Sequence, residues 1–155
     1  MTAEEFDPFV TEWLSFSQDP KYNLIEKCLK LAQILDYPEL NITDYIEKIN
    51  QIGNSLKLKI DDVENPIYLI SMLSEHIFEN YGFSGDDQNY YDPRNNFLNT
   101  VIDKKSGIPI TLSIVYTEIA KYIGLDLKIV GFPGHVIVKY NDAVSYTHLT
   151  LPTKA

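Results

Sequence analysis

Cysteine is nearly absent from this chain, which has only Cys28 in 155 residues. A single cysteine excludes an internal disulfide framework and a cysteine-rich zinc site. Basic residues are also few, because 13 Lys and Arg stand against 22 Asp and Glu, which gives a net charge of -9. A surface this negative repels phosphate backbones and anionic lipid, so we expect neither nucleic acid nor a membrane surface as a partner. We predict no metal ion and no cofactor, because the histidines are not grouped at ligand spacing.

Long apolar runs are missing as well. No run approaches the roughly 20 residues that span a bilayer. The acidic first residues show no basic region followed by an apolar one, so no secretory signal is visible. The composition, 45% hydrophobic and 23% charged, is typical of a globular domain. These features predict one soluble domain of the cytoplasm and leave a protein or peptide open as its partner.

The last residues carry an unusual signal. Residues 144–153, VSYTHLTLPT, can be read as the in-frame translation of a transposase-end adapter used in sequencing libraries. The alternative is a real threonine-rich C-terminal strand. We favour the adapter, and such segments are excluded from fold reasoning. The predicted organisation is an N-terminal extension (1–20), an incomplete domain (21–143) and the adapter-derived segment (144–155). This truncation would leave an unpaired sheet edge after Tyr140.

Helical periodicity dominates the first two thirds of the sequence. Apolar residues at helical spacing, with proline or glycine near the ends, predict helices over residues 21–35, 43–55, 66–81 and 95–103, and a short one around 10–16. Gly53-Asn54 is the expected stop of the second of these. Residues 108–124 are apolar nearly all round, which is typical of a helix covered on most sides.

Two β-rich segments follow this central helix, at residues 125–132 and 135–140. Pro133-Gly134 between them favours an antiparallel pair. The order predicts an α+β fold with a helical N-terminal half and a central helix packed on an antiparallel sheet.

A polar segment precedes the central helix. Its candidate ligand-binding residues are Tyr91, Asp92, Arg94, Asn95 and Asn96. The carboxylate, guanidinium and amides could frame a polar pocket beside the central helix. They could equally be structural, with Asp92-Pro93 starting a turn and Asn95 or Asn96 capping a helix.

Four segments of this sequence resemble the bacterial SirB family, a transglutaminase-like group often fused to tetratricopeptide repeats. They are LDYP at 35–38, NYYDPRNNFLN at 89–99, SGIPITLS at 106–113 and GFPGH at 131–135. The resemblance covers about residues 24–141. It implies a papain-like α+β core, in which a central helix packs against an antiparallel sheet.

Active transglutaminase-type enzymes carry a Cys–His–Asp triad, with the cysteine at the start of the central helix. The resemblance places the histidine at His135 and the nucleophile near residues 109–111, where no cysteine stands. Cys28 falls on the apolar stripe of an earlier helix, where we expect a buried thiol. The third triad member would lie past Asp142, in the segment read as adapter.

Two functions remain open from the sequence. The chain is a pseudoenzyme that serves as a binding or regulatory module, or it is an amide or ester hydrolase or acyltransferase. The second function would use Thr111 or Ser113 as nucleophile with His135 as base. We favour the first, because a neutral hydroxyl gains little from a helix N-terminus and Thr111 suits a capping role.

Overall fold

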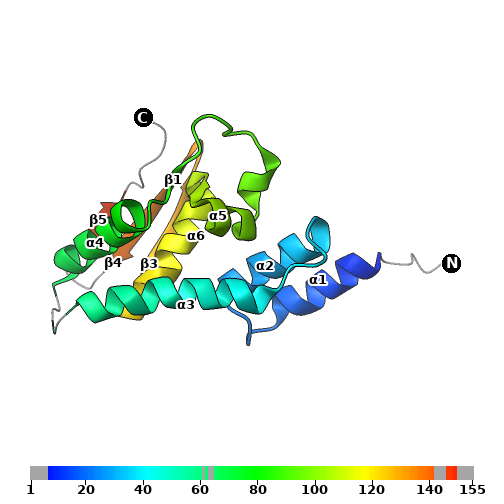
Figure 1. Cartoon of the computed structure of the whole chain (residues 1–155), viewed down its shortest axis with the longest axis horizontal. Helices are drawn as coiled ribbons and strands as arrows, with labels where there is room; N and C mark the ends of the chain where they lie inside the picture. Colours follow the sequence, from blue (N-terminus) through cyan, green and yellow to red (C-terminus); the bar gives the residue numbers. More distant parts are fainter. Residues whose placement is uncertain (1–6, 61, 63–64, 142–145, 150–155) are drawn as a thin grey trace.

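The computed structural model of the chain describes residues 7–60, 62, 65–141 and 146–149 (Figure 1). None of the helices in these residues is long and apolar enough to cross a membrane. The main helices are α1 (Pro8–Gln18), α2 (Leu24–Leu35), α3 (Ile42–Lys59), α4 (Pro66–Ser74), α5 (Leu98–Lys104) and α6 (Pro109–Ala120). Three short helical segments are the π-helical η1 (Glu75–Asn80) and the 3-10 segments η2 (Pro93–Asn96) and η3 (Lys121–Ile123). The strands are β1 (Ser84–Gly85), β2 (Ser106–Gly107), β3 (Leu127–Phe132), β4 (His135–Asn141) and β5 (Tyr146–Leu149).

Helix α6 lies at the centre of the fold, as its all-round apolar sequence predicts (Figure 1). Every residue from Thr111 to Ala120 is buried. The helix packs on α3 and α4, and its other side meets β3 and β4. A stripe of α2 residues that includes Ile25, Leu29 and Ala32 closes the core from the N-terminal half. The prediction of an α+β fold is confirmed.

The three-stranded sheet is antiparallel throughout, in the order β3-β4-β5. Gly124 adopts a left-handed φ of 77° where the helical segment ends, so the chain turns back along α6 as β3. The Pro133-Gly134 turn then pairs Phe132 with His135, as the sequence predicts. This hairpin fixes where His135 stands relative to α6.

Helix α3 is longer than predicted, because it continues through Gly53 to Lys59. Gly53 lies inside the helix and does not end it. Glycine is required at this position because the Tyr122 ring packs directly against its backbone. A Cβ at this position would lie 2.4 Å from that ring. The sequence pattern could not show this contact, because Tyr122 is distant along the chain.

The predicted helix over residues 66–81 is divided in two. Asn65 caps α4 by accepting hydrogen bonds from the amides of Ile67 and Tyr68. After Ser74 the helix widens into the π-helical η1, which ends before Gly82 at a φ of 78°. The predicted helix over 95–103 is likewise divided into η2 and α5.

The C-terminal segment pairs with the sheet, which tests the expectation of an unpaired edge after Tyr140. Tyr146–Leu149 pairs antiparallel with β4, with Val138 opposite Leu149. The edge of β4 beyond Tyr140 is therefore paired, and the expected open edge was wrong for this chain. Residues 144, 145 and 150–155 of the predicted adapter segment lie outside the described residues, and its adapter origin stays a prediction.

Candidate functional site: the N-terminal end of the central helix

The first turn of α6 contains the position where a transglutaminase-type nucleophile is expected. Pro109 occupies the first helical position, where its missing N–H costs nothing. The hydroxyl of Thr111 accepts a hydrogen bond from the amide of Ile108 at 3.2 Å and donates to the carbonyl of Asn95 at 3.1 Å. Thr111 is only 4% exposed. The predicted capping role of Thr111 is confirmed, in the form of a bond back to the residue before the helix.

Ser113 lies two residues after Thr111 in the same helix. Its side chain is fully buried at 0% exposure. Its hydroxyl donates to the carbonyl of Pro109 at 2.6 Å, the bond that serine in a helix commonly makes to the preceding turn. Both candidate hydroxyls therefore bond to the backbone beneath a packed surface.

His135 reaches the same end of α6 by way of the hairpin. Helix α6 has 12 residues, so it is about 18 Å long. Strand β3 has 6 residues, spans about 20 Å and runs back along the helix. His135 therefore begins β4 at the level of the first turn of α6. Its side chain is exposed and makes no hydrogen bond within the described part of the chain.

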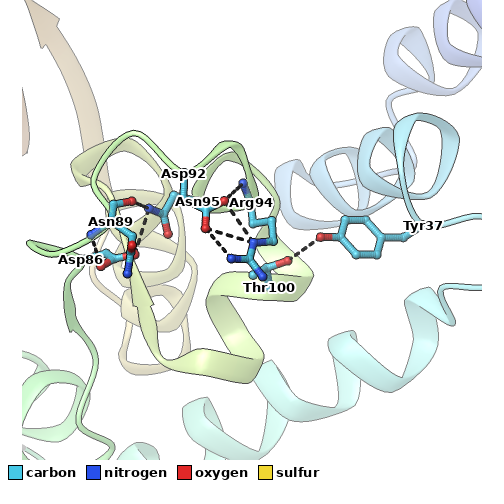
Figure 2. A network of polar contacts seen from close by, with 7 residues as sticks. All are labelled: Tyr37, Asp86, Asn89, Asp92, Arg94, Asn95 and Thr100. Carbon is cyan, nitrogen blue, oxygen red and sulfur yellow. Dashed lines mark hydrogen bonds and ion pairs between the residues drawn. The ribbon is translucent and has the colours of Figure 1, made fainter.

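The polar loop before α5 is organised around Asn95, which is 4% exposed (Figure 2). The side-chain amide of Asn95 donates to Asp86 Oδ2 at 3.2 Å and to the carbonyl of Asn89 at 2.9 Å. Asp86 Oδ1 in turn accepts from the amide of Asn89 at 3.0 Å. The side chain of Asn95 thus joins two parts of the loop, and its backbone carbonyl accepts a hydrogen bond from Thr111 of α6.

Asp92 and Arg94 form an ion pair on the outside of this loop (Figure 2). Arg94 Nη2 lies 2.6 Å from Asp92 Oδ2, and Arg94 Nε lies 3.0 Å from the same oxygen. Asp92 Oδ1 also accepts from the Arg94 amide, so Asp92 caps η2. The expected cap at Asn95 or Asn96 was wrong, because α5 begins only at Leu98 and Phe97 precedes it without a side-chain cap. The predicted start of a turn at Asp92-Pro93 is confirmed. Hydrogen bonds from the Arg94 side chain and amide lower the pKa of Asp92 to about 2.

The structure therefore brings part of the predicted site together. The loop touches α6 through Asn95, and a second bond joins the Asp86 amide to the carbonyl of Gly107 at 2.9 Å. Tyr91 is 92% exposed and Asn96 is also exposed, so both side chains are available to a ligand. His135 stands at the same end of the helix. We hypothesise that the loop and His135 line one cleft.

Cys28 lies at the other end of the central helix. It belongs to α2, and its neighbours include Glu118, nine residues after Pro109 in α6. That interval corresponds to about 13 Å along the helix axis. Burial, with a smaller contribution from the Glu118 charge, raises the pKa of the Cys28 thiol to about 11. A thiol with this pKa is almost entirely protonated near neutral pH.

Sequence reasoning missed three residues that support the loop: Asp86, Asn89 and Tyr37. Tyr37 extends from the link between α2 and α3, and its hydroxyl lies 3.0 Å from Thr100 Oγ1 of α5 (Figure 2). The spacing of Asp86 and Asn89 is a signal for a side-chain turn, since aspartate commonly binds backbone amides a few residues later. Tyr37 lies in the LDYP segment that carries the family resemblance, but its contact with Thr100 could not be predicted, because Thr100 is far away in the chain. The described residues hold no group of three or more His, Cys, Asp or Glu that could bind a metal ion.

The sequence is similar to those of several known proteins. A UPF0162 protein of Xylella fastidiosa is 31% identical over 126 residues, which are 81% of this chain and 44% of the relative. A UPF0162 protein of Pseudomonas aeruginosa is 31% identical over 97 residues, or 63% of this chain and 34% of the relative. Human F-box only protein 21 is 28% identical over 115 residues, or 70% of this chain and 18% of that protein. No solved structure matches the chain.

This chain spans less than half the length of these relatives. The family model described as the transglutaminase-like superfamily matches residues 43–152, which include α6 and the hairpin that carries His135. The chain therefore belongs to the transglutaminase-like superfamily, as a domain of the SirB type.

Proposed function

We propose that this SirB-type domain is a pseudoenzyme that serves as a binding or regulatory module. The observation that carries the proposal is the first turn of α6, where proline, isoleucine and threonine occupy residues 109–111 and no thiol stands. A papain-type mechanism needs a thiolate beside the histidine. Cys28 belongs to α2, and its pKa is raised to about 11, which disfavours the thiolate form.

The hydroxyls near His135 are poor substitutes for the missing thiol. Thr111 and Ser113 are 4% and 0% exposed. Both donate to backbone carbonyls, so a base would have to break these bonds before either oxygen could attack. These contacts support packing and capping roles over nucleophilic ones.

The relatives support the idea of a module. The same domain-length segment makes up 44% of a Xylella protein and 18% of human F-box only protein 21. A unit that occurs within proteins of different length is suited to contribute binding to a larger chain. Tetratricopeptide repeats beside the domain are part of this proposal.

A protein or peptide segment would bind at the N-terminal end of α6. There His135 and Tyr91 are exposed, and the Asp92–Arg94 pair stands outside the loop. An extended peptide laid between the hairpin and the loop would find an imidazole on one side and an aromatic ring on the other. The Asn95 network holds the loop against α6 for this purpose.

Turnover measurements test the absence of catalysis. We expect the chain to convert a glutamine-containing peptide and an activated ester no faster than buffer, because no activated nucleophile is present. The same result is expected for His135→Ala, for Thr111→Val and for Phe132→Ala, which removes the exposed partner of His135 in the hairpin. Turnover above background that disappears in His135→Ala and Thr111→Val but persists in Phe132→Ala would establish the hydrolase instead.

Peptide titration followed by NMR tests the binding site. We expect a bound glutamine-containing peptide to shift the resonances of His135, Tyr91 and Arg94 together, because all three would face it. Shifts on the loop alone, with His135 unmoved, would show that the loop and His135 do not share a cleft.

A further inference from the structure

A pocket of about 500 Å³ lies away from the end of α6 described above. It is formed by the link between α2 and α3, the first turn of α3, and Asn99 of α5. Two tyrosines in its wall are fixed to α5. The Tyr37 hydroxyl lies 3.0 Å from Thr100 Oγ1, and the Tyr45 hydroxyl donates to Asp103 at 2.6 Å. The pocket therefore has walls from three elements that are bonded to one another.

Asn99 contributes a polar group that the protein itself leaves unused. The residue is 5% exposed and lines the pocket. Its Oδ1 is buried and has no hydrogen-bond partner among the described residues. Leaving a buried amide oxygen unpaired costs free energy, so such atoms in proteins usually have a partner. The χ2 torsion of asparagine is broad, and rotation about it is the movement by which this oxygen would reach a donor in the pocket.

The charge of the pocket indicates the kind of donor. Asp36, Glu39 and Asp44 line it, are exposed, and make no ion pair within the described residues. The nearby cations are already engaged, because Lys48 pairs with Asp103 at 2.8 Å and Arg94 pairs with Asp92 at 2.6 Å. The N-terminus of α3 adds about half a positive charge, which three carboxylates outweigh. The pocket thus favours a cation that carries N–H groups.

We propose that this pocket binds a guanidinium group, which donates to Asn99 Oδ1 while Asp36, Glu39 and Asp44 hold its positive charge. A guanidinium has five N–H donors in a planar fork and so can serve the buried amide oxygen and a carboxylate at once. An ammonium ion has three donors on a single nitrogen, so it is less suited to bond the amide oxygen of Asn99 and a carboxylate at the same time. The pocket does not involve His135 or the first turn of α6, so the inference is independent of the proposed function.

A matched pair of ligands tests the charge requirement. Butylguanidine and butylurea have nearly the same shape, but only the first is a cation. We expect butylguanidine to shift the side-chain amide resonance of Asn99 saturably in NMR titrations of the full chain, and butylurea to bind at least about 10-fold more weakly. Equal binding of the two, binding of neither, or preferential binding of acetate would overturn the proposal.

Variants test the assigned residues. Neutralising the rim in Asp36→Asn/Glu39→Gln/Asp44→Asn should weaken butylguanidine binding at least about 10-fold. The control Glu47→Gln/Glu79→Gln/Asp87→Asn removes the same charge from exposed side chains outside the pocket and should change binding less than about 3-fold. Equal loss in the two triple variants would contradict a built site.

Asn99→Leu tests the amide oxygen separately. Followed on the backbone amide resonances of Asp36 and Asp44, butylguanidine binding should weaken about 10-fold, because the ligand loses its buried acceptor. If Asn99→Leu melts at a lower temperature than the parent chain, its loss of binding is not assigned to the amide oxygen. The triple variant of the exposed carboxylates Asp36, Glu39 and Asp44 then tests the proposal. Unchanged binding in a folded Asn99→Leu variant would remove Asn99 from the site.

The same titration distinguishes the two sources of a guanidinium. A capped Gly-Arg-Gly peptide that binds at least about 10-fold more tightly than butylguanidine identifies the arginine of a protein partner. Equal affinity identifies a small guanidine compound as the ligand. Either result supports the proposal, whereas a capped Gly-Lys-Gly peptide that binds better than the arginine peptide contradicts it.

Discussion

The side chain of His76 is enclosed between α3 and η1 at 1% exposure. Its Nε2 lies 2.9 Å from the carbonyl of Ile52, which can only accept, so Nε2 carries the proton. Its Nδ1 then accepts from the Lys59 ammonium at 3.0 Å. Ser55 lies beside Nε2 at 3.0 Å. These partners fit a neutral imidazole and leave no place for a second ring proton.

Stability should therefore fall in mild acid. Burial, helped by the Lys59 charge, lowers the pKa of His76. The unfolded chain takes up a proton near pH ~6.5 while the folded chain does not, so the free energy of unfolding decreases as the pH falls below that value. We expect this decrease in urea titrations between about pH 7.5 and 5.5.

A matched pair of variants assigns the effect to His76. His76→Gln should flatten the pH dependence of unfolding, while the exposed His135→Gln should leave it as in the parent chain. The same pH dependence in His76→Gln and the parent chain would show that another group is responsible.

Asp92 offers a second titration at the residue scale. Its pKa of about 2 lies below the ordinary 3.8, so its contribution to the native loop is complete above about pH 4 and is lost as the pH falls toward 2. Arg94→Gln removes the guanidinium bonds but keeps the amide bond, so the pKa should rise part of the way back. Carboxyl NMR titration measures this. An unchanged pKa in Arg94→Gln, or a larger rise in Lys104→Gln, would contradict the assignment.

At the scale of elements, the contact between α3 and η3 depends on one missing side chain. A Cβ on Gly53 would lie 2.4 Å from the Tyr122 ring, whose hydroxyl donates to Asn50 of the same helix. Neither partner can move away easily, because the ring is held by this hydrogen bond. Gly53 is therefore a packing residue of α3.

An overlap at 2.4 Å belongs to the upper end of the 1–3 kcal/mol that overpacking usually costs. Alanine regains roughly 1 kcal/mol over glycine within a helix, so Gly53→Ala should reduce the free energy of unfolding by about 2 kcal/mol. Chemical denaturation measures the change. Gly131→Ala is the control, because nothing lies within 4 Å of its Cβ position, and it should alter stability by no more than about 0.5 kcal/mol. A Gly53→Ala variant as stable as the parent chain would refute the close packing.

Some elements could be predicted from the sequence because their signals are local. The all-round apolar pattern of α6 and the Pro133-Gly134 hairpin needed no tertiary information. The continuation of α3 past Gly53 could not be predicted, because a residue about 70 positions away decides it. The parallel pairing of β1 with β2 was missed because each strand has only two residues, too few to show a periodic pattern in the sequence.

At the scale of the whole molecule, the resemblance points to a candidate site that periodicity alone does not indicate. It placed His135 at the start of a strand and the empty nucleophile position at the start of α6, and the fold has both elements there. The roles inside the loop could not be predicted, because Asn95 is held by side-chain bonds that span the turn. The pocket at Asn99 was missed as well, since its walls come from three separate elements.

We propose that the half-buried Cys28 is a packing residue and that the described residues hold no activated nucleophile. The rate of alkylation of Cys28 by iodoacetamide at pH 8 tests this most directly. With a pKa of about 11, Cys28 should react about 20-fold more slowly than a free cysteine, after allowing for the greater nucleophilicity of a more basic thiolate. The rate should be the same in His135→Ala. Alkylation faster than that of free cysteine, and slowed in His135→Ala, would reveal a thiolate–imidazolium pair and contradict the account.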